Sequence, residues 1–209
     1  MVQTWILLQD VNPVDAVAQG LDSSICGGCR LGPGSKRRTC YVNVGQAPLR
    51  IWQAWQAGGY DRQWTSSTFA NRAVRLGAYG DPAAVPNSVW QQVTAEARSW
   101  TGYTHQARNR KLQDVLAFCQ VSADTLAEAQ SCYTQGYGSF RVLSDKEEKA
   151  TWEKWCPAAE QQGAVQCVNC LLCHGVGASN IAIRVHGRSS KAFLDSGART
   201  GLALPKQQT

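Results

Sequence analysis

The residues most able to do chemistry are four cysteines and a histidine in one short stretch. Cys156 is followed by Cys167, Cys170 and Cys173, and His174 comes directly after the last of them. Two-residue spacings between thiols are typical of iron–sulfur binding runs and of zinc ribbons. Three cysteines at consecutive two-residue spacing favour a run that wraps a 4Fe-4S cluster, with zinc as the alternative. We therefore predict that the four thiols bind metal, with His174 able to replace one of them.

A second, thinner group of cysteines lies nearer the start of the chain. Two glycines separate Cys26 from Cys29, and Cys40 follows in the same Gly-, Ser- and Arg-rich segment. These three thiols are predicted metal ligands too, and they leave two hypotheses for a fourth ligand. It could come from Cys119 or Cys132, or the position could stay open for a substrate or cofactor, as it does in catalytic metal sites. A third possibility is that both cysteine groups share one larger structural site.

The composition favours reduced thiols over disulfides. The chain has 209 residues and nine cysteines, an odd number that fits metal ligands plus spare thiols better than a closed disulfide set. The N-terminus lacks the basic start and long apolar region of a signal peptide, and no apolar run approaches the roughly 20 residues that span a bilayer. We therefore expect a cytoplasmic protein without membrane contact. Residues 1–187 are predicted to form one α/β metal-binding domain and residues 188–209 a basic, flexible tail.

Basic residues are unevenly distributed along the chain. The formal net charge is +6, and there is no Asp or Glu from Ser23 to Tyr60. Basic blocks of this kind suit phosphate-bearing partners, so we expect nucleic acid or another anionic substrate as the partner. The alternative is a solvated surface on a mildly basic protein. The residues predicted to bind nucleic acid are Arg30, Lys36, Arg37 and Arg38.

Strand and helix patterns alternate along the chain. Predicted strands cover residues 3–8, 73–79, 100–105, 115–119, 137–143 and 180–186, and predicted helices cover 48–57, 87–99, 106–112, 122–135 and a segment from 144 toward 155. Ser144 and Glu147 have the spacing of a capping box that would open the last helix. The alternation predicts parallel pairing with right-handed crossovers. The fold class is therefore α/β, a parallel-stranded partial or open (β/α) barrel with cysteine-rich metal-binding loops; a doubly wound sheet is the alternative.

In either architecture, functional side chains collect at the carboxyl ends of the strands. We expect both cysteine groups at the same mouth of the scaffold. The polar residues predicted at strand ends are Tyr79, Asp81, His105, Gln120, Ser122, Ser144 and His186.

The order of elements and several motifs resemble the small radical-SAM-like proteins carried by phages and plasmids. In that family a three-cysteine loop ends in Cys-Tyr, as Cys40-Tyr41 does here, and a strand with a Gly-x-x-Gly-Asp turn follows, as at residues 77–81. The cysteine spacing, two residues and then ten, differs from the family's three and then two. The chain also resembles a group of phage-type, cysteine-rich proteins that share Cys-Tyr-Val-Asn, Gly-Asp-Pro-Ala-Ala-Val-Pro and Gly-Tyr-Thr-His-Gln.

The radical-SAM resemblance implies separate roles for the two cysteine groups. Cys26, Cys29 and Cys40 would bind a 4Fe-4S cluster that holds S-adenosylmethionine, and the four later cysteines would bind an auxiliary cluster. Strand-end side chains would face the substrate or the methionine moiety. The catalytic residues that the resemblance implies are Asp81, Tyr103, His105 and Ser122.

Three functions follow from these patterns. The first is an iron–sulfur, radical-SAM-like enzyme that acts on an anionic substrate such as nucleic acid. The second is a zinc-stabilised nucleic-acid-binding protein without catalysis, in which the thiols are structural and the arginines contact phosphate. The third is a transglycosylase-like barrel that modifies bases, with structural zinc and with Asp81 or Asp124 as nucleophile or base.

Overall fold

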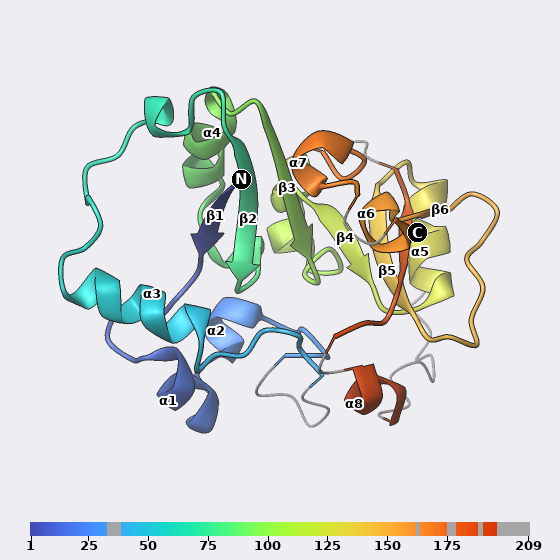
Figure 1. Ribbon diagram of the computed structural model, residues 1–209, viewed down its shortest axis with the longest axis horizontal. Coiled ribbons are helices and arrows are strands. Elements are labelled where there is room, and N and C mark those ends of the chain that lie inside the picture. Colours follow the sequence, from blue (N-terminus) through green and yellow to red (C-terminus); the bar gives the residue numbers. More distant parts are fainter. Residues whose placement is uncertain (33–38, 162–163, 175–178, 188–189, 196–209) are drawn as a thin grey trace.

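One open parallel sheet organises the chain (Figure 1). The computed structural model describes residues 1–32, 39–161, 164–174, 179–187 and 190–195. The seven strands lie in the order β1-β2-β3-β4-β5-β7-β6, and every neighbouring pair is parallel. The predicted α/β class is confirmed, and the open all-parallel sheet agrees with a partial barrel.

The strands are short, and those in the centre are buried. Every position of β2 is buried except Arg75 and Gly77, which are half-buried, as expected for a central strand of a covered parallel sheet. The strands are β1 (Val2–Trp5), β2 (Ala73–Tyr79), β3 (Ser99–Thr104), β4 (Gln120–Ala123), β5 (Ser139–Leu143), β6 (Lys154–Trp155) and β7 (Ile181–Arg184).

Helices cover both faces and the lower edge of the sheet in Figure 1. Helices α4 and α5 connect neighbouring strands and lie behind the sheet, α6 and α7 lie in front of it, and α1 to α3 lie below the ends of the first strands. The α-helices are α1 (Pro13–Ala18), α2 (Ser23–Cys26), α3 (Ala47–Gln56), α4 (Asn87–Ala95), α5 (Leu126–Thr134), α6 (Pro157–Glu160), α7 (Cys167–Cys170) and α8 (Ser190–Asp195). The 3₁₀ helices are η1 (Ser66–Phe69), η2 (Pro82–Ala84) and η3 (Arg110–Ala117).

The main hydrophobic core lies between β2 and α4. Val74 and Leu76 of β2 pack in one cluster with Trp90 and Val93 of α4, and all four are at most 2% exposed. Burial of this apolar face is what holds α4 on the sheet. A smaller cluster of Leu116, Val121 and Cys132 fixes η3 and α5 to β4.

Two predicted elements are wrong. Residues 115–119 were expected as a strand, but η3 runs through Ala117 and β4 begins only at Gln120. Val115 and Leu116 are buried from a 3₁₀ turn, and a short apolar run cannot distinguish such a turn from a strand. No helix begins at Ser144, although Ser144 does donate its backbone N–H to Glu147 Oε2 at 2.9 Å.

The predicted tail is only partly described. Within residues 188–209, Ser190–Asp195 form α8, and Phe193 of that helix is buried; residues 188–189 and 196–209 lie outside the described part of the chain. Among the described helices, none combines the length and the apolar character needed to cross a membrane.

Candidate metal centre

The first cysteine group lies below the carboxyl ends of β2 and β3, held there by backbone contacts. The backbone N–H of Asp81, just after β2, donates to the Ile25 carbonyl at 2.7 Å. Gln106, just after β3, donates from Nε2 to the Cys26 carbonyl and accepts from the Gly28 N–H, both at 3.3 Å. Gly27 has φ +57°, and a Cβ there would lie 2.4 Å from the Gln106 amide. These contacts therefore fix the position of the Cys26–Cys29 turn in the protein alone.

The Asp81 carboxylate ties the two strand tips together. Its Oδ1 accepts from Ala83 N–H at 3.0 Å and from Thr104 Oγ1 at 2.8 Å, and its Oδ2 accepts from His105 N–H at 2.8 Å. Asp81 is 5% exposed, so these three bonds compensate for the loss of water around its charge. Asp81, a predicted catalytic residue, thus has a clear positioning role in the fold.

The three thiols of Cys26, Cys29 and Cys40 lie close enough to influence one another. Burial, followed by the nearby Cys29 thiol, raises the pKa of Cys26 to about 12. Burial likewise raises the pKa of Cys40 to about 11, although the Val42 N–H that donates to its Sγ at 3.4 Å opposes this, and Cys29 adds to the rise. None of the nine cysteines, all of which lie in the described part of the chain, forms a disulfide. In the protein alone these two thiols are protonated, and metal binding would have to release those protons.

Two buried hydroxyl groups lie beside this cysteine group. Tyr79, 3% exposed, places its OH against the Cys26 thiol and near that of Cys40, and burial and those thiols raise its pKa. Among the described residues, Thr39 Oγ1 has no hydrogen-bond partner, and Tyr79 OH has none besides its contact with the Cys26 thiol. Buried hydroxyls without partners are rare in folded proteins, so an absent acceptor such as a metal-bound sulfur fits here.

His105 places one ring nitrogen between a thiol and a carboxylate. Its Nε2 lies 3.9 Å from Cys29 Sγ and 3.6 Å from Asp124 Oδ1. Burial alone would lower the pKa of His105, but Asp124 and Cys29 outweigh it and raise the pKa to about 10. Both contacts use the same nitrogen, whereas a Cys-His-Asp relay needs one partner on each ring nitrogen. The arrangement therefore fits a fixed cation beside Cys29 better than a relay that activates it.

The second cysteine group is separate from the first. It lies in α7 and its neighbours, at the end of the sheet opposite to α2 (Figure 1). His174 Nδ1 accepts from the Trp100 N–H at 3.2 Å, and the two rings lie 4.8 Å apart. That contact holds the segment against the first half of β3. The neighbouring strand β4 pairs only with the second half of β3, at Tyr103 and Thr104. The expectation that both groups share one mouth, or one larger site, is not met.

Within this second group the thiols are again neighbours. Burial raises the pKa of Cys173 to about 11, a hydrogen bond with Tyr103 opposes the rise, and the thiols of Cys156, Cys167 and Cys170 add to it. Tyr103, predicted as catalytic near the first group, thus belongs beside the second, and its ring also packs on Phe140 with centroids 4.8 Å apart.

The donor chemistry of both groups suits a metal, but the sulfurs do not converge. Across the described part of the chain, no three His, Cys, Asp or Glu side chains are arranged so that they could hold a metal ion as they stand. Binding would have to draw the thiols together. Scans against protein-family models and searches of curated proteins and of solved structures found no match.

The remaining predicted residues are dispersed. Gln120 begins β4 and Ser122 lies within it, so neither follows the carboxyl end of a strand, because β4 starts later than expected. Arg30 forms ion pairs inside the protein, and Lys36, Arg37 and Arg38 lie outside the described residues. Cys119 and Cys132, considered as a fourth ligand, are buried in the hydrophobic clusters.

Two residues at the first group were missed by sequence reasoning, Gln106 and Glu128. Glu128 had a signal, because Thr125 and Glu128 have capping-box spacing and Thr125 Oγ1 does accept from the Glu128 N–H. Gln106 had no local sequence signal, since its role depends on the backbone of a distant loop.

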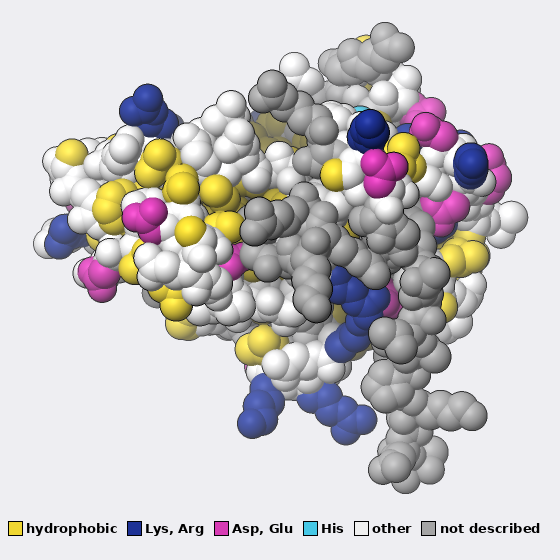
Figure 2. All heavy atoms as spheres, turned by 90° about the horizontal axis from the view of Figure 1, so that it is seen from below, with side chains coloured by type: hydrophobic (Ala, Val, Ile, Leu, Met, Phe, Trp, Pro, Cys, Tyr) yellow, Lys and Arg dark blue, Asp and Glu magenta, His cyan; other side chains and the backbone are white. Residues whose placement is uncertain are grey.

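Figure 2 views this lower edge of the molecule, with basic side chains on its rim and apolar side chains gathered toward the α1 and α3 end.

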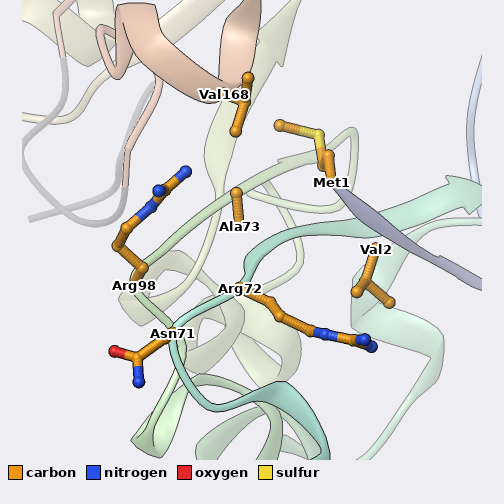
Figure 3. A pocket seen from close by; sticks show the side chains of 7 residues that line it. All are labelled: Met1, Val2, Asn71, Arg72, Ala73, Arg98 and Val168. Carbon is orange, nitrogen blue, oxygen red and sulfur yellow. The ribbon is translucent and has the colours of Figure 1, made fainter.

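A cavity of about 420 Å³ lies at the other edge of the sheet, where β1 and β2 begin. Its arginines, Arg72 and Arg98, point in different directions (Figure 3), so they do not converge on one anion. It contains no thiol. Its lining residues are Met1, Val2, Asn71, Arg72, Ala73, Arg98 and Val168.

Proposed function

We propose that the protein is an iron–sulfur, radical-SAM-like enzyme whose catalytic centre is held by Cys26, Cys29 and Cys40. The observation that carries the proposal is that the Cys26–Cys29 turn is fixed in place at the carboxyl ends of β2 and β3. Contacts from Asp81 and Gln106 hold it against two adjacent strand tips. The carboxyl edge of a parallel sheet is where α/β enzymes place their sites.

The surroundings of the three thiols support a bound cluster. A backbone N–H donates to Cys40 Sγ. The Tyr79 hydroxyl is buried against the Cys26 thiol, and the buried Thr39 hydroxyl has no partner within the part of the chain that the structure describes. Hydrogen bonds to cluster sulfurs are among the features that set the properties of iron–sulfur centres. Cys26, Cys29 and Cys40 would hold the cluster, and a bound cluster would supply electrons to a small-molecule cofactor such as S-adenosylmethionine.

The protein's own residues then have distinct tasks. Tyr79 and Thr39 would donate to the sulfurs, and Asp81 holds the strand tips that carry His105 and the turn. The neighbouring rim can attract an anionic substrate, because Arg110 and Lys111 are exposed and no ion pair engages them among the described residues. Such exposed cations steer phosphate-bearing molecules.

The second cysteine group is proposed as an auxiliary metal site. Four thiols can close a coordination shell, which is typical of structural zinc as well as of an iron–sulfur cluster. Two contacts would support its ligands: Tyr103 is hydrogen-bonded to Cys173, and His174 accepts from the Trp100 N–H. Zinc at this group is therefore the alternative, and a zinc-stabilised nucleic-acid-binding protein remains the second candidate function.

The proposed function is tested by cleavage of S-adenosylmethionine. Protein reconstituted with iron and sulfide without oxygen is mixed with S-adenosylmethionine and dithionite, and methionine release is measured. We expect release by the wild type and by Cys132→Ala, whose thiol lies in a hydrophobic cluster away from the centre. Cys29→Ala should release at least about 100-fold less, because loss of one ligand removes the cluster. Equal release by Cys29→Ala, or none by any protein, contradicts the proposal.

A further inference from the structure

A network of four charged side chains connects the cysteine turn to β4 and α5. Arg30 follows Cys29 directly, and its guanidinium lies 3.9 Å from Asp124 Oδ2 and 3.5 Å from Glu128 Oε1. Arg108, after β3, forms an ion pair with the same Glu128 oxygen. The other Glu128 oxygen, Oε2, accepts from the Asp124 N–H at 2.7 Å. Two arginines thus meet two carboxylates, and the His105 ring lies 3.6 Å from Asp124 as well.

The carboxylates are the fixed part of this network. The Asp124 side chain is 11% exposed and that of Glu128 is 7%, whereas Arg30 and Arg108 are 32% and 43% exposed. Asp124 ends the β4 tip, and Glu128 lies in the first turn of α5, where Thr125 Oγ1 accepts from its N–H. Both acids are therefore held by secondary structure, and the arginines reach to them from loops.

The same carboxylates act on Cys29 from two sides. On one side, Arg30, the residue directly after Cys29, forms ion pairs with Asp124 and Glu128. On the other side, His105 Nε2 lies between Cys29 Sγ and Asp124 Oδ1. With Asp81 and Gln106 holding the other end of the turn, the tips of β2, β3 and β4 each contact the loop. Glu128 and Asp124 supply the contact from the third tip.

We propose that Glu128 and Asp124 are positioning residues of the cysteine centre, fixing Cys29 through Arg30 and His105. Arg30 is then an internal anchor rather than a contact for phosphate. The inference rests on the proposed function for what Cys29 does, but the position of Cys29 can be measured in metal-free protein.

The test is the alkylation rate of Cys29 in reduced, metal-free protein, followed by mass spectrometry with the exposed Cys167 as internal reference. Glu128→Gln and Arg30→Gln each remove the ion pair between Arg30 and Glu128 and leave the His105–Asp124 contact in place. The Cys29 rate is divided by the fraction of Cys29 ionised, taken from the pH–rate profile of each variant, because the thiolate is the species that reacts. We expect this corrected rate relative to Cys167 to rise roughly three- to tenfold in each variant, because local opening of the loop becomes easier. Glu148→Gln is the matched control, since Glu148 pairs with Arg184 at 3.6 Å on the surface.

Two further variants separate positioning from general stability. Arg30→Lys keeps the charge and should retain most of the protection. The double variant Arg30→Gln/Glu128→Gln should exceed neither single variant by more than about twofold, because each single variant already removes the Arg30–Glu128 ion pair. An unchanged Cys29 rate in Glu128→Gln and Arg30→Gln overturns the inference. So does a parallel rise at Cys119, which is buried in the main hydrophobic core away from α5 and would report general unfolding. Because no metal is present, failure to bind iron would not affect the result.

Discussion

At the scale of single residues, a buried ion pair joins β5 to the segment before β6. Arg141 Nε lies 2.8 Å from Glu153 Oε1, and Arg141 Nη2 lies 2.5 Å from Oε2, which also accepts from Ala150 N–H at 2.8 Å. Both side chains are 2% exposed or less. Both charges lose their hydration on burial, and removing one partner leaves the other buried without any compensating contact.

Removal of one partner of this pair should destabilise the protein strongly. We expect Glu153→Ala to lower the free energy of unfolding by about 3–5 kcal/mol, because it leaves the Arg141 guanidinium buried and unpaired. Urea unfolding of reduced, metal-free protein measures this. The double variant Arg141→Met/Glu153→Leu should recover most of the loss. Glu148→Ala, at an exposed ion pair, should cost below about 1 kcal/mol, and a similar cost for Glu153→Ala would show that the buried pair does not form.

At the scale of elements, the tip of β2 depends on two glycines in left-handed conformations. Gly77 and Gly80 have φ values of +66° and +82°. A Cβ on Gly80 would lie 2.6 Å from Ile6 Cβ and 3.1 Å from the Ile6 carbonyl oxygen, so β1 would have to move. This turn sets the position of Asp81, which carries the polar contacts to β3.

Gly80→Ala should therefore be far more costly than an alanine at a left-handed glycine in open space. Gly136 has φ +76° and nothing within 4 Å of its ideal Cβ, which makes it the matched control. We expect Gly136→Ala to cost about 1 kcal/mol from backbone strain alone, and Gly80→Ala about 2–5 kcal/mol because overpacking adds to strain. Thermal and urea unfolding compare them. Equal costs would mean that β1 does not pack on the turn as described.

Most elements could be predicted from their local patterns, and the failures have physical reasons. The helix at Ala47–Gln56 and the strand at Ala73–Tyr79 follow from proline, glycine and apolar periodicity. Val115 and Leu116 were assigned to a strand because burial alone does not specify backbone conformation. Ser144 donates its N–H and its hydroxyl to Glu147 Oε2, and the Glu147 N–H donates to the Ser144 carbonyl. These contacts form a turn that no helix follows, so the capping-box spacing misled the prediction.

At the scale of the whole molecule, alternation of strands and helices was enough to predict an open parallel sheet. It also placed Asp81 and His105 together with Cys29, because carboxyl ends of neighbouring parallel strands share an edge. It could not place Tyr103 or the second cysteine group. Tyr103 precedes the end of β3, and the segment carrying Cys173 docks on β3 through His174, a long-range contact without a local sequence signal.

The most direct test of the central claim, a cluster at Cys26, Cys29 and Cys40, is metal analysis of protein reconstituted anaerobically with iron and sulfide. Iron, sulfide and zinc are measured per chain in the wild type, Cys40→Ala and Cys132→Ala. We predict a brown wild type absorbing near about 400 nm, loss of about four irons and four sulfides in Cys40→Ala, and no loss in Cys132→Ala. A colourless wild type, or a Cys40→Ala protein with the full iron and sulfide content, would contradict the claim.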